Sequence, residues 1–316
     1  MTRFATLGGL ITAAMLAAGP ATAADALKAT VGQRGNWDTA VIELGQMAGI
    51  FQKHGLEVEV VYTSGSGETL QPVISGSVDI GIAVGTLGAM AAYAKGAPVR
   101  IIGAQATGAA DYWYAKDPAI KTLQDTNGRT IAYSTNGSST QSIVRAFINE
   151  NKLTTKPQAT GNPSATLTAV MTGQVDVGWA SPPFGLKELE EGKTHVVAKA
   201  TDSALVRGQT IRVIVANADA LKTKRAAIER FMQAYRDTID HMYASPQVLK
   251  DYAAFTKTSE PVAKRVRDEF FPKSLIDPDT VKGLPSLMEE AVNLKFIPAP
   301  LTEQQQAELI QLVPRK

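Results

Sequence analysis

The chain has 316 residues, a formal net charge of +2 and no cysteine. The absence of cysteine excludes disulfides, thiolate catalysis and cysteine-bound metals. Lysine and arginine are spread without a basic run, which argues against a nucleic-acid partner. The histidines, His54, His195 and His241, follow no metal-ligand spacing, so we expect neither a metal nor another cofactor.

The first 23 residues have the features of a secretory signal peptide. Arg3 gives a positive start, residues 4–19 are apolar and rich in small residues, and Ala21-Thr22-Ala23 fits the small-x-small cleavage rule. We therefore expect cleavage after Ala23 and export to the periplasm, with no cysteine for a lipid anchor. The alternative, an uncleaved membrane anchor, is disfavoured because the run is short and interrupted by glycine.

The first part of the mature chain alternates strand and helix patterns. Apolar alternation and helical spacing predict strands over 28–32, 56–62, 78–84 and 99–104, and helices over 39–54, 68–75 and 85–95. The strand over 78–84 is almost wholly apolar, as a strand buried on both faces should be. Strands separated by short helices predict βαβ units and a mostly parallel sheet.

The following segment repeats this order. Strands are predicted over 112–116, 130–133, 158–161 and 175–180, with helices over 141–151 and 165–172. Further strands are expected at 196–197 and 210–217, and from residue 222 the chain reads as helical. Two α/β units in succession are therefore predicted.

One sequence motif occurs twice. Residues 73–81 (VISGSVDIG) recur as residues 170–178 (VMTGQVDVG), an offset of 97 residues. The repeat predicts two similar lobes with a ligand-binding cleft between them. We expect lobe one to comprise residues 24–106 plus 208–316 and lobe two residues 107–207, with two hinge crossings that contain Gly108 and Gly208.

The repeat also contains two equivalent carboxylates, Asp79 and Asp176. Paired carboxylates can be catalytic, as in glycosidases. Each of these, however, follows a helix-ending Gly-x-Val and begins a buried strand, so we interpret both as parts of the repeated scaffold.

A polar segment precedes the helix expected at 141–151. Residues 134–140 contain five hydroxyl side chains: Ser134, Thr135, Ser138, Ser139 and Thr140. A helix N-terminus with clustered hydroxyls can bind an anion such as a carboxylate, sulfonate or phosphate. The alternative is that one of these residues merely caps the helix.

Lobe one has two loops at comparable positions. Ser64, Gly65 and Ser66 follow the second strand, and Gly85 with Thr86 follows the third. Open α/β sheets bind ligands at the carboxyl ends of their parallel strands. Both loops are therefore candidate ligand contacts, although ordinary strand-to-helix turns would look the same.

Two tryptophans lie at strand ends. Trp37 follows the first strand of lobe one, and Trp179 ends the third strand of lobe two, where Ser181 follows it. Such a pair could sandwich an apolar or aromatic ligand, or it could pack in the lobe cores. Arg34, Asn36 and Asp38 flank Trp37 and could set ligand polarity, whereas for Arg212 a surface salt bridge is the favoured interpretation.

Several of these motifs together resemble a known family. They are GIFxxxGL at 49–56, SGxxDIG at 75–81, KGAPV at 95–99 and GxxD at 173–176. The combination resembles periplasmic substrate-binding proteins of ABC importers in the nitrate/sulfonate/taurine class. The resemblance implies an α/β fold with two similar lobes, mostly parallel sheets and a two-crossing hinge, which is the type II binding-protein fold.

The resemblance also implies a function without catalysis. The chain would capture a small, anionic organic ligand of the sulfonate or carboxylate type and deliver it, as a monomer, to a membrane ABC permease with its ATPase. The ASPPF loop at 180–184 departs from the taurine and sulfonate members, so an aromatic or branched carboxylate is an equal expectation. The implied contacts are Asn36, Trp37, Ser64, Gly65, Ser66, Gly85, Thr86, Ser138, Ser139, Thr140, Trp179 and Ser181.

Two alternatives stay open. Some relatives are pyrimidine synthases that use a histidine and a cysteine-rich segment, and this chain has no cysteine. The chain could also serve a different importer or a sensor kinase, which the sequence does not distinguish.

Overall fold

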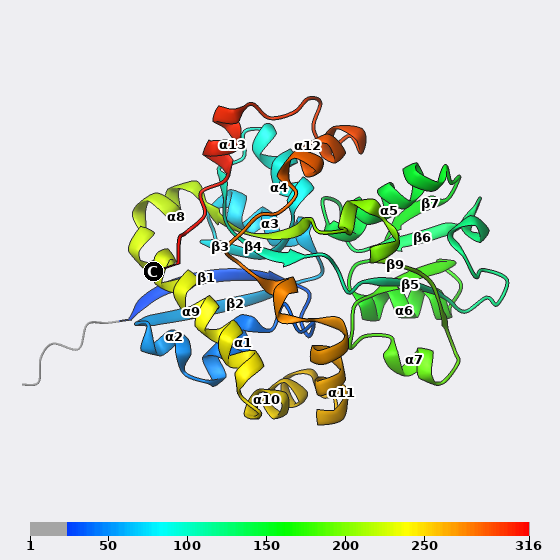
Figure 1. Ribbon diagram of the computed structural model, residues 1–316, viewed down its shortest axis with the longest axis horizontal. Coiled ribbons are helices and arrows are strands. Elements are labelled where there is room, and N and C mark those ends of the chain that lie inside the picture. The colour runs from blue at the N-terminus through cyan, green and yellow to red at the C-terminus, as the bar shows by residue number, and fades with distance from the viewer. Residues whose placement is uncertain (1–23, 316) are drawn as a thin grey trace, which may run out of the picture.

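The computed structural model describes residues 24–315, so the predicted signal peptide lies outside the described residues. The chain folds into two α/β lobes, each built on one five-stranded sheet. Figure 1 shows the lobe that contains residues 25–107 and the lobe that contains residues 112–199 side by side. They are called lobe one and lobe two below.

The sheet of lobe one has the order β2-β1-β3-β10-β4. Its strands are β1 (Asp25–Gly32), β2 (Leu56–Thr63), β3 (Ile80–Gly85), β4 (Val99–Thr107) and β10 (Thr210–Asn217). Strand β1 pairs in parallel with β2 and β3, whereas β10 runs antiparallel between β3 and β4. The strand that returns from lobe two is thereby inserted into the sheet of lobe one.

The sheet of lobe two repeats this arrangement in the order β7-β6-β8-β5-β9. Its strands are β5 (Tyr112–Ala115), β6 (Thr130–Tyr133), β7 (Lys156–Ala159), β8 (Val177–Ala180) and β9 (His195–Lys199). Here β5 is the antiparallel strand, paired with β8 and β9. The expected two-lobed α/β fold is confirmed, with the refinement that each sheet is mixed because of one inserted antiparallel strand.

Helices cover both faces of the sheet in lobe one. Figure 1 shows α1, α2 and α9 on one side of it and α3, α4 and α12 on the other. Residues of β10 alternate accordingly, because Ile214 packs with the α1 and α9 side chains, whereas Val213 and Val215 pack with those of α3, α4 and α12. The helices before β10 are, in lobe one, α1 (Val41–Met47), α2 (Ile50–Lys53), α3 (Ser66–Ser75) and α4 (Thr86–Ala94), and, in lobe two, α5 (Ser139–Asn151), α6 (Pro163–Met171) and α7 (Leu186–Glu190).

The C-terminal part is helical, as expected. It contains α8 (Ala218–Thr223), α9 (Arg225–Ala244), α10 (Gln247–Thr256), α11 (Glu260–Arg265), α12 (Leu284–Asn293) and α13 (Glu303–Leu309). The single helix predicted over 39–54 is instead two, α1 and α2. Gly49 lies between them with φ of 68°, a left-handed conformation that a continuous helix cannot contain.

The repeated aspartates anchor the scaffold. Asp79 Oδ2 accepts a hydrogen bond from the Lys28 backbone N–H at 2.9 Å, and Asp176 Oδ2 accepts one from the Thr130 N–H at 2.8 Å. Asp79 thus joins the start of β3 to β1, and Asp176 joins the start of β8 to β6. This geometry supports their interpretation as structural residues.

The chain crosses between the lobes twice, after β4 and before β10. The crossings touch each other, because the Gly108 N–H donates to the Gln209 carbonyl at 2.9 Å. Gly108 and Gly208 both have left-handed φ values, of 85° and 71°. The boundary expected at 106/107 falls one residue before the end of β4, and the exact division into lobes stays a prediction.

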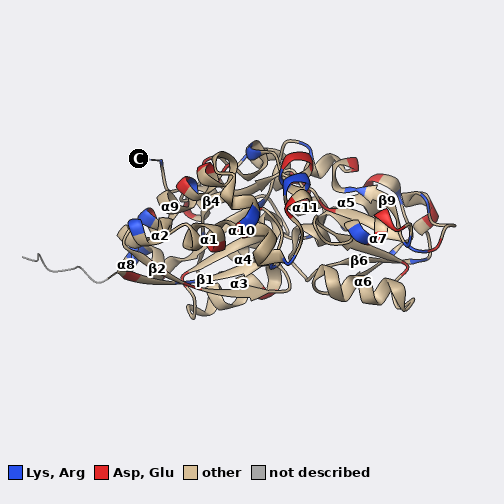
Figure 2. Ribbon diagram, turned by 90° about the horizontal axis from the view of Figure 1, so that it is seen from below, with Lys and Arg blue, Asp and Glu red and all other residues tan. Residues whose placement is uncertain are grey.

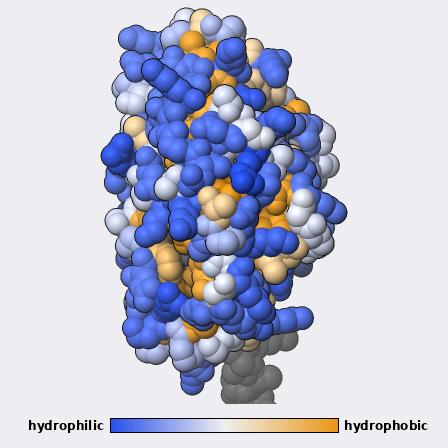
Figure 3. Space-filling model, turned by 90° about the vertical axis from the view of Figure 1, so that its right-hand side faces the viewer, coloured by the Kyte–Doolittle hydropathy of each residue, from blue (hydrophilic) through white to orange (hydrophobic). Residues whose placement is uncertain are grey.

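The surface carries charges of both signs. Figure 2 shows lysine and arginine interspersed with aspartate and glutamate over the outer helices. On the end of the molecule in Figure 3, small hydrophobic areas are separated by hydrophilic atoms. Among the described residues, no helix combines the length and the apolar character needed to cross a bilayer.

Candidate ligand-binding site

A small polar cavity lies where the two lobes meet. Its volume is about 20 Å³, roughly the room that one water molecule requires. Both lobes contribute to its wall. The lining residues are Gly32, Gln33, Asn36, Thr39, Gly65, Ser66, Ala83, Asp111, Ser134, Ser139, Thr140, Trp179 and Arg212.

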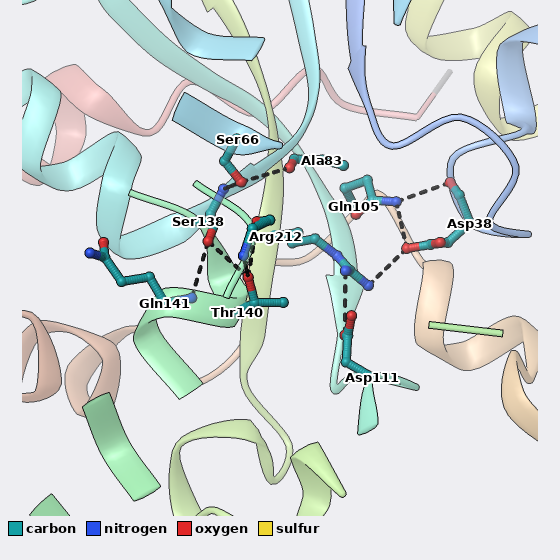
Figure 4. Close-up of polar contacts among 11 residues, drawn as sticks. Asp38, Ser66, Ala83, Gln105, Asp111, Ser138, Thr140, Gln141 and Arg212 are labelled. Atoms are coloured by element: carbon teal, nitrogen blue, oxygen red, sulfur yellow. Dashed lines mark hydrogen bonds and ion pairs between the residues drawn. The ribbon is translucent and has the colours of Figure 1, made fainter. Parts of the chain in front are cut away.

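The hydroxyl-rich segment before α5 is part of this wall. Ser138 caps the helix, since its Oγ accepts a hydrogen bond from the Gln141 N–H at 3.0 Å. The Thr140 hydroxyl lies 2.9 Å from the Ser138 hydroxyl (Figure 4). It also lies 2.9 Å from the Ser134 hydroxyl. These side chains are therefore already linked to one another, and their contact with a ligand stays a prediction.

Glycines of lobe one bring the lobes into close contact at this segment. The Gly67 N–H donates to Thr135 Oγ1 of lobe two at 3.1 Å. A Cβ atom on Gly65 would lie 2.7 Å from the same oxygen, and one on Gly85 would lie 2.6 Å from the Gly137 carbonyl oxygen. A Cβ on Gly88 would lie only 2.1 Å from that oxygen. Side chains at these positions would hold the lobes apart.

A buried charge cluster lies beside the cavity. Arg212 of β10 places one guanidinium nitrogen 2.9 Å from Asp38 Oδ2 and another 3.5 Å from Asp111 Oδ2 (Figure 4). The Arg212 side chain is 6% exposed, so the expected surface salt bridge is instead an interior one. Burial raises the pKa of the Asp111 carboxyl above its ordinary value, and the guanidinium offsets this only in part.

Two residues of the cavity wall have unusual backbone conformations. Gln33 has φ of 69° and Ala83 has φ of 63°, both in the left-handed region that side chains other than glycine rarely adopt. Strained residues of this kind cluster at binding and catalytic sites, where surrounding structure holds them in place. After the buried charge cluster, these two strained backbone conformations are a second feature of the cavity wall that is typical of a functional site.

Several buried polar atoms at the cavity have no hydrogen-bond partner within the described chain. They are Gln33 Oε1, Asn36 Oδ1, Asp111 Oδ1, Trp179 Nε1 and Arg212 Nε. Buried polar atoms are nearly always paired, so each is a candidate contact for a bound molecule.

The two tryptophans of the sequence analysis are not brought together. Trp37 is fully buried in lobe one, where it packs edge-on against Tyr252 and donates its indole N–H to the Tyr243 hydroxyl at 3.1 Å. Its place in the core follows from the aromatic side chains of α9 and α10. Trp179 pairs across β5 and β8 with Trp113 and borders the cavity. Trp37 therefore follows the alternative named in the sequence analysis, packing in the lobe core, whereas contact of Trp179 with a ligand stays a prediction.

Other predicted contacts lie near the cavity without lining it. The Thr86 hydroxyl donates to the Thr210 carbonyl at 2.6 Å, which ties α4 to the second crossing. Gly85 packs beneath the segment before α5. Ser181 is fully buried, with an Oγ that has no partner among the described residues.

A second, larger cavity opens between the lobes beside Gln33, and we call it the mouth cavity. Its volume is about 480 Å³. Of the predicted ligand contacts Ser64 lines it, and so does Arg34, which the sequence analysis named as a residue that could set ligand polarity. The full lining is Gln33, Arg34, Gly35, Tyr62, Thr63, Ser64, Asn162, Pro163, Ser164, Pro183, Phe184, Thr256 and Thr258.

The sequence repeat could have identified some of the cavity-lining residues that the sequence analysis did not name. The offset of 97 residues equates Gly65 with Asn162, so the candidate loop of lobe one had a counterpart at residues 161–164. Asp111 and Arg212 had no such signal, because their partners are 101 and 174 positions away in the sequence.

Groups that could bind a metal were also sought among the described residues. No cluster of three or more histidine, aspartate, glutamate or cysteine side chains has a suitable arrangement there. None of the three histidines lines either of the two cavities.

Two α/β lobes on mixed sheets, with cavities between them, make up the two-lobed periplasmic-binding-protein fold. Residues 36–248 match the family model described as NMT1/THI5 like, so the chain belongs to the NMT1/THI5-like family. This family assignment confirms the resemblance seen in the sequence. No curated protein matches the chain significantly in sequence.

Solved structures with this fold include three informative neighbours. The alkanesulfonate-binding protein SsuA from Xanthomonas axonopodis pv. citri, bound to MOPS, superposes with a TM-score of 0.74 at 16% identity, covering 90% of this chain and 98% of that one. The aliphatic sulphonate binding protein SsuA from Escherichia coli gives 0.69 at 19% identity, with 92% and 94% covered. The nitrate-binding protein NrtA from Synechocystis PCC 6803 gives 0.72 at 12% identity, with 90% and 85% covered. At these identities the likeness concerns the fold.

Proposed function

We propose that the chain is the extracytoplasmic solute-binding protein of an ABC importer. It captures a small organic anion, of the sulfonate or carboxylate type, between its lobes and delivers it to a membrane permease with its ATPase. The observation that carries the proposal is the pair of cavities walled by residues of both lobes. A ligand held there touches both lobes at once only in the closed form, so it binds that form more tightly and shifts the lobes toward closure.

Membership in the NMT1/THI5-like family supports this function, and so do the sulfonate- and nitrate-binding names of the structural neighbours. Signal-peptide cleavage after Ala23 and a periplasmic, monomeric protein complete the proposal. The closed form presents both lobes at once, which allows a permease to distinguish it from the open form.

The proposal contains no chemical step. A synthase on the same fold would need reactive groups at the cleft, and the charged residues that line the two cavities are Arg34, Asp111 and Arg212. Consumption of the bound ligand during prolonged incubation would favour the enzyme instead.

A thermal-shift screen of the mature chain tests the proposal. The protein is first unfolded and refolded to remove any carried-over ligand, then heated with alkanesulfonates, nitrate, aromatic and branched carboxylates, and pyrimidines. A ligand at about a thousand times its Kd adds roughly 4 kcal/mol to the free energy of unfolding, a shift of several degrees. A well-folded chain that responds to no compound, and that co-purifies with none in native mass spectrometry, would contradict the proposal.

A further inference from the structure

The buried cluster beside the inner cavity offers no spare positive charge. Arg212 is the cation there, and it is already held by Asp38 and Asp111, whose side chains are 0% and 1% exposed. One guanidinium therefore faces two carboxyl groups, and the cluster is neutral or negative whichever form Asp111 takes. A ligand anion placed against it would meet no unmatched cation.

The mouth cavity differs in charge and in size. At about 480 Å³ it falls within the range of small-molecule sites, roughly 300–1,000 Å³. Arg34 is the one charged residue among its lining residues. Within residues 24–315 the Arg34 guanidinium has no ion pair and no hydrogen bond, and it stacks 4.1 Å from the centroid of the Phe255 ring.

The stacking on Phe255 orients this cation. When the flat face of a guanidinium stacks on an aromatic ring, the N–H groups along its edge stay free. Two of these N–H groups can donate hydrogen bonds to the two oxygens of one carboxylate. Tyr62 lies 5.8 Å from the same guanidinium and also lines the cavity. Burial raises the pKa of the Tyr62 phenol well above its ordinary value, so this ring adds no negative charge.

Lobe two supplies the opposite wall. Helix α6 begins there, with Asn162 as its cap, Pro163 in its first turn and Ser164 on the cavity wall. The first turn of a helix carries partial positive charge. Phe184 lines the same wall, and its ring covers Gly35 of lobe one, where a Cβ would lie 3.1 Å from Phe184 Cζ.

We propose that the mouth cavity is the ligand subsite for an aromatic monocarboxylate, with the carboxylate on Arg34 and the ring between Tyr62 and Phe184. This assignment rests on the proposed function and specifies its ligand. Because Arg34 and Tyr62 belong to lobe one and Phe184 to lobe two, such a ligand would contact both lobes and favour closure.

The probes for a test are benzoate, its hydroxy-, methyl- and amino-substituted forms, benzenesulfonate, and the neutral isostere benzamide. Binding to the full mature chain is measured by isothermal titration calorimetry. We expect a benzoate-class probe to bind at least tenfold more tightly than benzamide. Arg34→Gln should lower the affinity for that probe at least tenfold and leave benzamide unaffected.

Lys222→Gln is the control that also removes one exposed positive charge from lobe one. Lys222 lies on α8 and lines neither the mouth cavity nor the inner cavity. We expect Lys222→Gln to bind the benzoate-class probe within twofold of wild type. Because Arg34 is exposed, its variant should unfold at nearly the wild-type temperature, which excludes misfolding as the cause of lost binding.

The outcomes separate this inference from the proposed function. Unchanged benzoate affinity in Arg34→Gln would overturn the subsite and leave ligand capture intact. A chain that binds alkanesulfonates or nitrate but no aromatic acid would likewise overturn the inference alone. Tighter binding of benzenesulfonate than of every carboxylate would overturn the carboxylate assignment.

Discussion

Closure of the two lobes should depend on a glycine in α4. Gly88 faces the segment before α5, and a Cβ atom there would lie 2.1 Å from the Gly137 carbonyl oxygen. Real Cβ atoms essentially never come within 3.0 Å of such an atom, so Gly88→Ala must push α4 and the segment apart by about 0.9 Å. The atoms that this Cβ would meet belong to the backbone of Gly137, and a backbone segment cannot rotate away as a flexible side chain could.

The size of the effect follows from two opposing terms. Overpacking of this kind costs about 1–3 kcal/mol, and here the cost falls on the closed form alone. Ligand affinity should therefore fall by about 5- to 150-fold, since every 1.4 kcal/mol is tenfold. In the open form the same change replaces glycine by alanine inside a helix, which is favourable by about 0.5–1 kcal/mol. Gly88→Ala should thus weaken ligand binding while keeping or raising the unfolding temperature of the ligand-free chain.

The assay combines calorimetry, using the ligand from the thermal-shift screen, with X-ray solution scattering of the chain with and without that ligand. Gly96→Ala is the control, because Gly96 has φ of 85° and no atom within 4 Å of its Cβ position. That variant should lose about 1 kcal/mol of folding stability and still compact normally with ligand. If Gly88→Ala binds and compacts like wild type, the glycine contact does not control closure.

Three further predictions concern the scaffold and its tryptophans. Burial raises the pKa of Asp176, but hydrogen bonds from the Thr130 N–H and hydroxyl outweigh it and lower the pKa. The resulting stability is present at neutral pH and is lost as pH falls through the folded pKa, so Asp176→Asn should lower stability at pH 7 in urea unfolding by up to about 1 kcal/mol, since the carboxylate is partly solvated, and this cost should shrink as pH falls below the ordinary aspartate pKa. Asp111 has the opposite shift, mainly from burial, so the folded state binds the extra proton and stability falls as pH rises above the ordinary value. Asp111→Asn should flatten that fall at pH values above the ordinary aspartate pKa, and a wild-type slope in the variant would contradict the assignment. For fluorescence, a change on lobe closure should come mainly from Trp179, which borders the inner cavity between the lobes, so Trp179→Phe should reduce it and Trp37→Phe, in the core of lobe one, should preserve it.

The sequence predicted the parts of the fold that depend on local pattern. The 97-residue repeat is reproduced down to single hydrogen bonds, since the Thr63 and Thr69 hydroxyls lie 2.6 Å apart and their counterparts Thr160 and Thr166 also lie 2.6 Å apart. These side chains tie a strand end to the following helix, so sequence neighbours determine them. Local periodicity and turn residues predicted the strands and helices that these side chains join, but not the hydroxyl contacts themselves.

Features that depend on distant parts of the chain were out of reach. The alternation in residues 210–217 predicts a strand, but it carries no information that β10 enters between β3 and β4. Arg212 looked like a surface residue for the same reason, because the carboxylates that bury it come from the loop after β1 and from the first crossing. Trp37 was placed correctly after a strand, yet its burial depends on aromatic side chains about 200 positions away.

The repeat is most informative where its two copies differ. Gly65 at the start of α3 and Asn162 at the start of α6 occupy equivalent positions. Glycine is required in lobe one because lobe two approaches there within 2.7 Å of a would-be Cβ, whereas asparagine caps α6 with its side-chain oxygen on the Ala165 N–H. The start of α3 in lobe one therefore provides a surface without a side chain, against which lobe two packs. The equivalent start of α6 in lobe two carries a polar capping side chain. A cleft between two copies of one unit can become a selective site only through such differences, and they identify the loops at 64–67 and 161–164 as the places to alter ligand preference.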